Sequence, residues 1–242
     1  MFGALPGVKA PDPAPDSGAG PSGPRSSTGS ATLPAVSPHL TAQLDRLIDL
    51  GVPQLAGLAP AAFSDLAAGL DEPDADETLV VHPTLVPASR LAPLLSLADR
   101  PGFVVPDMTD LDEFVPIDGL SVPDRPLYLV RDIDRGDDFR NDTPDETLPR
   151  ITEAGRSPLT VNEGISWLLQ HPDRLVPNHC FMTIGSRKPK GKQLDRRTPA
   201  IWISGGSDLD GGRARKGAPK VGWCWAGNRH TWLGIASAAG RR

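Results

Sequence analysis

Apolar side chains recur at helical spacing in two stretches that follow residue 39. Spacings of three and four residues place such side chains on one face of a helix. Gly51 and Pro53 end the first stretch, and an acidic run at residues 71–77 follows the second, which favours a solvated linker there. We therefore expect two helices that pack as a hairpin. Their apolar positions are Leu40, Leu44, Leu47 and Ile48 in the first helix and Phe63, Leu66, Ala67 and Leu70 in the second.

Short apolar runs separated by turn residues come next. Residues 79–81, 103–105 and 127–130 are each bounded by Pro or acidic residues, a pattern typical of strands. Apolar positions within residues 91–98 predict a helix, in which Pro93 fits only in the first turn. A strand, a helix and a strand in this order predict that the first two strands are parallel neighbours in a small mixed sheet.

The clearest local signal is the segment from Thr160 to Glu163. The Thr160 hydroxyl can accept a hydrogen bond from the Glu163 amide while the Glu163 carboxylate reaches back, which fixes the start of a helix. We expect this helix to end before Pro172. Three strands that pair in an antiparallel manner are the simplest interpretation of the runs that follow. These strands are expected at residues 181–184, 200–204 and 221–225.

Together these elements predict an α+β fold, with amino-terminal helices and a mixed or antiparallel sheet in a single domain at residues 39–240. Residues 1–38 are rich in Pro, Gly, Ser and Ala, so they lack the apolar surface that would offset the entropy of ordering, and we expect a disordered leader. The sequence shows neither a signal peptide nor a stretch of membrane-spanning length. Two cysteines give no disulfide framework, and we expect a cytoplasmic protein with free, buried thiols and no membrane partner.

Charge is distributed unevenly behind a net charge of -5. Residues 61–150 contain 20 acidic and 7 basic side chains, whereas residues 183–242 contain 13 basic and 3 acidic ones. One interpretation is that the acidic and basic parts lie against each other within one fold. The other is that the basic part meets an anionic ligand or nucleic acid.

The last predicted strand has two unlike faces because side chains alternate along a strand. Val221, Trp223 and Trp225 share one face, whereas the opposite face carries only small side chains, those of Gly222, Cys224 and Ala226. The small face can pack closely against the helix that contains Ile165, or against a ligand. Alternation also predicts that Cys224 is buried, and a buried thiol is chemically inert.

A glycine-flanked loop at residues 226–234 concentrates polar chemistry. Asn228 offers an amide, Arg229 can hold an anion with two hydrogen bonds, and His230 can exchange a proton near neutral pH. The alternative is that these side chains only tie down the loop backbone. We take His230 as the candidate catalytic acid or base. The candidate binding residues are Arg187, Trp202, Trp225, Asn228, Arg229, His230 and Trp232, with Arg187 as the expected neighbour of the loop.

Standard motifs are absent on close comparison. Residues 185–193 resemble a phosphate-binding loop, but the glycine spacing is one too long and Gln193 stands where a magnesium ligand is needed. Residues 132–143 lack the bidentate Glu of a calcium loop. The four candidate zinc ligands are His179, Cys180, Cys224 and His230, and no two of them have the short sequence spacing that usually marks a zinc site. We therefore predict no metal and no cofactor.

The chain resembles an uncharacterised conserved family, a domain of unknown function from high-GC, actinobacterial-type bacteria. The resemblance covers most of residues 40–238, is strongest at residues 156–238, and implies a bacterial cytosolic protein without indicating an activity. Two basic loops, residues 188–197 and 205–219, are longer than the family pattern. The matching segments are Arg156 to Thr160, Glu163 to Ile165, Cys180 and Phe181, Gly185 to Arg187, Pro199 to Ser204, Gly222 to Asn228, and His230 to Gly234.

Three functional hypotheses follow. The first is a non-catalytic protein that binds a small molecule or another protein on a Trp-lined carboxy-terminal surface. The second is a hydrolase or transferase that acts on an anionic substrate, with His230 as acid or base and Arg187 or Arg229 as the anion clamp. The third is nucleic-acid binding through the basic carboxy-terminal segment, which also supplies four tryptophans.

Overall fold

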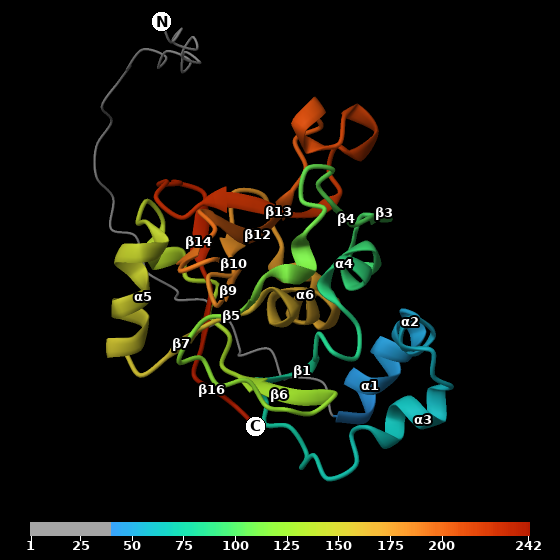
Figure 1. The fold of residues 1–242 in the computed structure, drawn as a ribbon. Helices are drawn as coiled ribbons and strands as arrows, with labels where there is room; N and C mark the ends of the chain where they lie inside the picture. The colour runs from blue at the N-terminus through green and yellow to red at the C-terminus, as the bar shows by residue number, and fades with distance from the viewer. Residues whose placement is uncertain (1–39) are drawn as a thin grey trace, which may run out of the picture. The chain divides into compact units, whose positions relative to one another are not determined.

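Helix α6 (Val161–Gln170) lies between two β-sheets in the computed structural model, which describes residues 40–242 (Figure 1). All ten residues of α6 are buried, so this helix forms the middle layer of the core. The predicted leader at residues 1–38 lies outside the described residues. Within the described residues no helix is long and apolar enough to cross a membrane.

The smaller sheet has the strand order β1-β6-β16 and is antiparallel throughout. Its strands are β1 (Glu77–Val81), β6 (Leu127–Arg131) and β16 (Gly240–Arg241). The larger sheet has the order β14-β8-β12-β13-β4. Its strands are β14 (Leu233–Ile235), β8 (Cys180–Met182), β12 (Arg197–Ile203), β13 (Pro219–Trp225) and β4 (Phe103–Val104).

The larger sheet is mixed. Strand β12 pairs in an antiparallel manner with β8 and β13, which confirms the prediction for these three strands. The two outer strands, β4 and β14, pair in parallel with their neighbours. The α+β class predicted from the sequence is therefore confirmed.

The predicted parallel pairing of the first two strands is wrong. Strand β1 pairs with β6 in the smaller sheet, whereas β4 pairs with β13 in the larger one. The connection between β1 and β4 contains α4 (Ala88–Leu91), the 3-10 turn η1 (Ala92–Leu94) and the hairpin β2 (Ser96–Leu97) and β3 (Arg100–Pro101). It passes beside α6 and carries the chain from one sheet to the other, so the two strands never meet.

The first predicted amino-terminal helix is present as α1 (Leu40–Asp49). The second is α3 (Pro60–Asp65), which ends before the predicted positions Leu66, Ala67 and Leu70, and the short helix α2 (Val52–Ala56) between them was not predicted. Gly51 has a φ of 84°, which lets the chain reverse after α1. Pro53 lies in the first turn of α2, where a backbone amide hydrogen would have no partner within the helix. This proline therefore follows α1 and also helps to start α2.

A buried ion pair joins α6 to the smaller sheet. Glu163 is fully buried, and Arg241 of β16 donates to both of its carboxylate oxygens at 2.6 and 2.8 Å. Tyr128 of β6 donates a third hydrogen bond to Glu163 at 3.0 Å. The capping box predicted for Thr160 and Glu163 is present as well, so this carboxylate serves both the helix start and the pairing with Arg241.

Helix α5 (Pro144–Glu153) was not predicted. It begins with a second capping box, in which Thr143 and Glu146 exchange hydrogen bonds and Pro144 occupies the first turn. The sequence Thr-x-x-Glu with a proline after the cap is a helix-start signal, but the polar composition of the segment hides its apolar face. Thr147 and Ile151 are the buried side chains of that face.

Short elements complete the described chain. Two-residue strands form the pairs β5 (Val115–Pro116) with β9 (Ser186–Arg187), β10 (Pro189–Lys190) with β11 (Gln193–Leu194), and β7 (Ser157–Pro158) with β15 (Ser237–Ala238). The 3-10 turns are η2 (Leu111–Glu113), η3 (Asp137–Phe139), η4 (Pro172–Arg174), η5 (Asp208–Asp210) and η6 (Arg213–Arg215). The basic loop at 188–197 thus contains a small hairpin, and the one at 205–219 contains two turns.

The small face of β13 does not receive α6. The helix approaches the sheet at Gly164, where an added methyl group would lie 2.7 Å from Thr183 and 3.3 Å from Ile201. Ile201 is the cross-strand neighbour of Val221, so the helix packs on the Val221 face. Gly222 faces the other way and is covered by Trp202, whose ring would lie 2.7 Å from an added methyl group.

Candidate functional site

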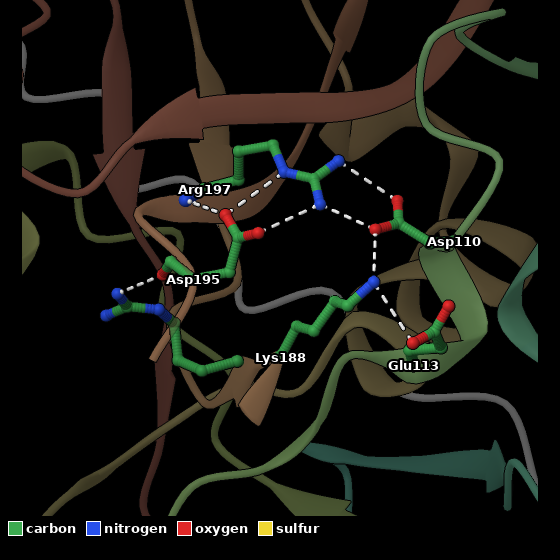
Figure 2. Close-up of polar contacts among 6 residues, drawn as sticks. Asp110, Glu113, Lys188, Asp195 and Arg197 are labelled. Atoms are coloured by element: carbon green, nitrogen blue, oxygen red, sulfur yellow. Dashed lines mark hydrogen bonds and ion pairs between the residues drawn. The ribbon is translucent and has the colours of Figure 1, made fainter. Parts of the chain in front are cut away.

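Five charged side chains join the segment 186–197, called here the arm, to the η2 turn. Figure 2 shows Arg197 between two carboxylates: it donates to Asp110 at 2.5 and 3.0 Å and to Asp195 at 3.1 Å. Lys188 lies 2.7 Å from Asp110 and 3.0 Å from Glu113. We call this set the arm network. It links residues that are far apart in the sequence, so it sets the position of the arm.

Opposite charges stabilise one another in the arm network, in which two basic side chains pair with three carboxylates. Hydrogen bonds from Arg197 and then from Lys188 hold the pKa of Asp110 well below its usual range. Arg197 also lowers the pKa of Asp195, and both carboxylates raise the pKa of Arg197 in return. The Arg197 guanidinium additionally lies over the Phe114 ring, 5.4 Å from its centroid. The charged forms of Asp110, Asp195 and Arg197 are therefore favoured, and these three groups hold one another in place.

Arg187 is attached to this network through backbone rather than through a carboxylate. Its Nη2 atom donates to the Asp195 carbonyl oxygen at 2.9 Å, and its Nε atom is buried with no hydrogen-bond partner among residues 40–242. Burial lowers the pKa of Arg187, against the attraction of Asp145 and Asp195. No carboxylate of the described chain forms an ion pair with it. The arm network thus positions a half-buried guanidinium whose charge is not matched by a contacting anion.

Arg187 lines a cleft between the arm and the amino-terminal end of α5. The volume of the cleft is about 450 Å³. That volume is within the range of small-molecule sites in proteins. Lys192 lies at the tip of the arm, and Asp145 belongs to the first turn of α5. The remaining lining residues are Ile117, Asp118, Pro144, Leu148, Ile184, Pro189, Gly191, Gln193 and Leu194.

A second, smaller cavity of about 90 Å³ lies at the start of α6. Strands β5 and β9 separate it from the cleft, since Val115 and Ser186 line the smaller cavity while Arg187 lines the larger one. The Ser186 hydroxyl at this cavity already accepts a hydrogen bond from the Val161 amide, at 2.9 Å. The walls are mainly apolar, and the smaller cavity carries no unmatched charge comparable to Arg187.

The predicted tryptophan surface divides between the two faces of the larger sheet. Trp202 packs over the buried amine of Lys220, with Nζ 4.0 Å from the ring centroid, and its ring also contacts Trp232 at 6.2 Å. Trp223 and Trp225 point to the opposite face and contact each other at 4.6 Å. Trp225 is 43% exposed. Trp202 therefore does not extend the surface of the other two, because it pairs with Lys220, whose side chain lies on the face of β13 opposite to Trp223 and Trp225.

His230 lies beside the Trp202 and Trp232 pair. Its ring contacts Trp232 edge-on, with centroids 5.6 Å apart, and its Nε2 atom is buried without a partner among the described residues. Burial lowers the pKa of His230. His230 does not line the cleft that contains Arg187, so these two candidates are not brought together.

Arg229 and Asn228 belong to the loop between β13 and β14. Arg229 donates to Glu146 at 2.5 Å and to the Asn141 carbonyl at 2.8 Å, which fastens the loop to the start of α5. Asn228 is exposed, and its backbone amide donates to the Trp225 carbonyl at 3.0 Å. The geometry thus gives Arg229 a structural role in joining two segments.

Sequence reasoning missed most of the cleft. Asp145, Leu148 and Lys192 were not singled out, and Asp118 follows a strand too short to be recognised. The capping signal at Thr143 could have located the start of α5, but nothing in the sequence places that helix opposite the arm. The prediction for Cys224 is confirmed: the thiol is free and buried, and burial raises its pKa to about 12. Within residues 40–242 no three His, Cys, Asp or Glu side chains are grouped so as to hold a metal ion.

Comparison with known families matches residues 46–242 to a family of unknown function, DUF5701. The chain belongs to this family, and the match covers both sheets, α6 and the whole cleft. No curated protein and no solved structure matches the chain. The uncharacterised family predicted from the sequence is confirmed at this level, and the function has to be argued from the site itself.

Proposed function

We propose that this domain is a non-catalytic binding protein that holds an anionic group in the cleft between the arm and α5, with Arg187 as the anchor. The observation that carries the proposal is the half-buried guanidinium of Arg187, which has a free Nε–H and no contacting carboxylate among the described residues. A charge removed from water is costly unless it is paired. A carboxylate or phosphate that accepts from Nε and Nη would supply that pairing with two parallel hydrogen bonds.

Rigidity of the arm supports the proposal. Arg187 is held through Asp195, Asp195 through Arg197, and Arg197 through Asp110 on a separate segment (Figure 2). A side chain that is already positioned loses less entropy when its ligand arrives, so more of the interaction energy appears as affinity. Lys192 adds a second positive charge at the same cleft.

A binding role fits the chemistry of the lining better than a catalytic one. None of the described residues that line the cleft is a Ser, Thr, Cys or His, so the cleft holds no hydroxyl, thiol or imidazole to act as nucleophile or proton carrier. His230, the predicted acid or base, lies outside it. Partner binding through the exposed Trp225 remains a prediction.

The test is calorimetric titration of the full chain with caproate, whose carboxylate and short apolar tail match the lining. We expect Arg187→Ala to weaken binding at least tenfold, and Arg187→Lys to restore part of the affinity, because Lys keeps the charge without the two-pronged geometry. Arg196→Ala is the matched control: Arg196 is exposed on the same arm and does not line the cleft. A second matched pair is Lys192→Ala, expected to weaken binding, against Lys190→Ala, expected to leave it unchanged.

Two results would contradict the proposal. One is caproate affinity that is equal for the wild type, Arg187→Ala and Lys192→Ala, all shown by circular dichroism to be folded. The other is an equal loss of caproate affinity in the variants of lining residues and in their controls. That result would indicate nonspecific attraction to a basic segment rather than a binding site.

We also propose that the protein belongs to the cytoplasm of high-GC bacteria. Support comes from the resemblance of the sequence and from Cys180 and Cys224, both of which are free and buried, as is usual in reducing compartments. Fractionation of cells that express a tagged chain tests this, and recovery outside the cytoplasm would contradict it.

A further inference from the structure

We infer that the ligand of the cleft is a zwitterion with an apolar body, such as an apolar amino acid or a short peptide, rather than a simple anion. This inference rests on the proposed function, since it assigns a second contact to the same ligand. The cleft presents positive groups on one wall and carboxylates on the others, and these groups do not satisfy one another.

The positive wall is the arm, which contributes Arg187 and Lys192. The facing carboxylates come from two other segments: Asp145 from the first turn of α5 and Asp118 from the chain after β5. Neither Asp145 nor Asp118 forms an ion pair or a side-chain hydrogen bond with any residue of the described chain, which leaves both carboxylates available to a ligand. A cleft that received only an anion would be expected to exclude carboxylates, because like charges reduce the affinity.

The separation of Arg187 and Asp145 also favours a ligand with two charges. The Asp145 carboxylate is close enough to raise the pKa of Arg187, yet no ion pair joins them. Two opposite charges that interact across an open cleft without contact leave room between them. A molecule whose anionic group meets Arg187 and whose ammonium group meets Asp145 fills that space and pairs both charges.

The rest of the lining determines the body of the ligand. Ile117, Leu148 and Ile184 are branched aliphatic side chains from three different segments, and Leu194, which is 46% exposed, lies on the arm. Contact with an apolar body would remove these groups from water. The recognised class is therefore a molecule with ammonium and carboxylate groups and a hydrocarbon portion.

The experiment compares three probes that share a linear six-carbon chain and differ in their charged groups. Caproate carries a carboxylate, hexylamine an ammonium group, and ε-aminocaproate both groups at opposite ends of the chain. Leucine is a second zwitterion, in which both groups are bonded to the same carbon. Each is titrated against the full chain and followed by calorimetry and by NMR shifts of the backbone amides. We expect at least one of the two zwitterions to bind at least fivefold more tightly than caproate, and hexylamine to bind most weakly.

The variant Asp145→Asn should change the affinity for the two kinds of probe in opposite directions. Affinity for the preferred zwitterion should fall three- to fivefold, because an ion pair is lost. Affinity for caproate should rise, because a repelling charge is removed. Asp138→Asn is the control, with the same charge change at an exposed residue that does not line the cleft. The same two affinities measured for Asp118→Asn show whether the Asp118 carboxylate contacts the ligand.

The outcomes separate this inference from the proposed function. If caproate binds in an Arg187-dependent manner but neither zwitterion gains affinity, or if Asp145→Asn strengthens zwitterions and caproate alike, the inference is overturned and the anion site stands. Zwitterion binding that does not depend on Arg187 also overturns it. If no probe binds the folded wild type, both the proposed function and the inference fail.

Discussion

Gly164 lies where helix α6 closely approaches the larger sheet. Its neighbours are Thr183 and Phe181 of the β8 segment and Ile201 of β12, at 2.7 to 3.3 Å from the position of an added methyl group. Real side chains do not tolerate the shortest of these separations. A glycine in the middle of a helix is unfavourable by itself, so its presence here is explained by packing rather than by helix formation.

The substitution Gly164→Ala tests this. Alanine should gain up to about 1 kcal/mol in helix propensity. The clash with three buried side chains should cost more, about 1 to 3 kcal/mol, because an overfilled core forces its neighbours to move. We expect a net decrease in the free energy of unfolding measured by urea denaturation. A more stable variant would show that α6 can shift away from the larger sheet.

The arm and the η2 turn show how two elements with little structure of their own are fixed. Strands β9, β10 and β11 have two residues each, so their backbone hydrogen bonds alone cannot hold the arm. Asp110 and Asp195 supply the missing constraints by pairing with Arg197 and Lys188. These pairs are partly buried, and a network of several charges in good geometry contributes more than isolated surface pairs.

The network makes stability depend on pH. Arg197 and Lys188 lower the pKa of Asp110 in the folded state, so the unfolded chain takes up a proton first as the pH falls. The contribution of the network is present at neutral pH and is lost progressively below about pH 4, the ordinary pKa of aspartate. Asp110→Asn should therefore lower stability by about 1 to 2 kcal/mol at neutral pH.

Acid denaturation checks this prediction. The wild type should lose stability more steeply than Asp110→Asn between about pH 4 and pH 2, so the two curves converge. Asp138→Asn, at an exposed residue, is the control and should follow the wild type. Curves that stay parallel across this range would show that the depressed pKa of Asp110 does not contribute to folding.

At the scale of the whole described chain, the carboxy terminus completes the core. Strand β16 adds the third strand to the smaller sheet, and Arg241 reaches Glu163 on the central helix. The uneven distribution of charge along the sequence is explained by ion pairs within the fold. Acidic groups such as Glu77 and Glu146 pair with basic groups such as Arg242 and Arg229. The interpretation that the acidic and basic parts lie against each other is confirmed by these pairs.

Replacing Arg241 should therefore affect the entire fold. Its side chain is 5% exposed and that of Glu163 is fully buried, so Arg241→Met leaves a buried carboxylate without an opposite charge, at a cost of about 3 to 5 kcal/mol. Arg229→Met removes a pair whose side chains are about half exposed and screened by solvent, and should destabilise the fold far less. Urea denaturation of both variants measures the difference, and equal losses would contradict the role assigned to Arg241.

Features that depend on neighbours along the chain could be predicted from the amino-acid sequence. The helix start at Thr160, the strand alternation that buries Cys224, and the antiparallel strands around β12 follow from local spacing and hydrogen-bonding capacity. Helix α5 belongs to this group as well, since its capping box at Thr143 is local, although its polar composition concealed it. The α+β class follows because these elements require a shared core.

Which elements face each other could not be predicted, because this depends on packing in the folded chain. The placement of β1 and β4 in different sheets, the burial of α6 on all sides and the separation of Trp202 from Trp225 depend on contacts between distant segments. The cleft depends on them most of all, because Arg187 and Asp145 come from segments that no periodicity relates. The basic character of Arg187 could be predicted from the sequence, whereas the absence of a contacting carboxylate among residues 40–242 is a property of the folded chain alone.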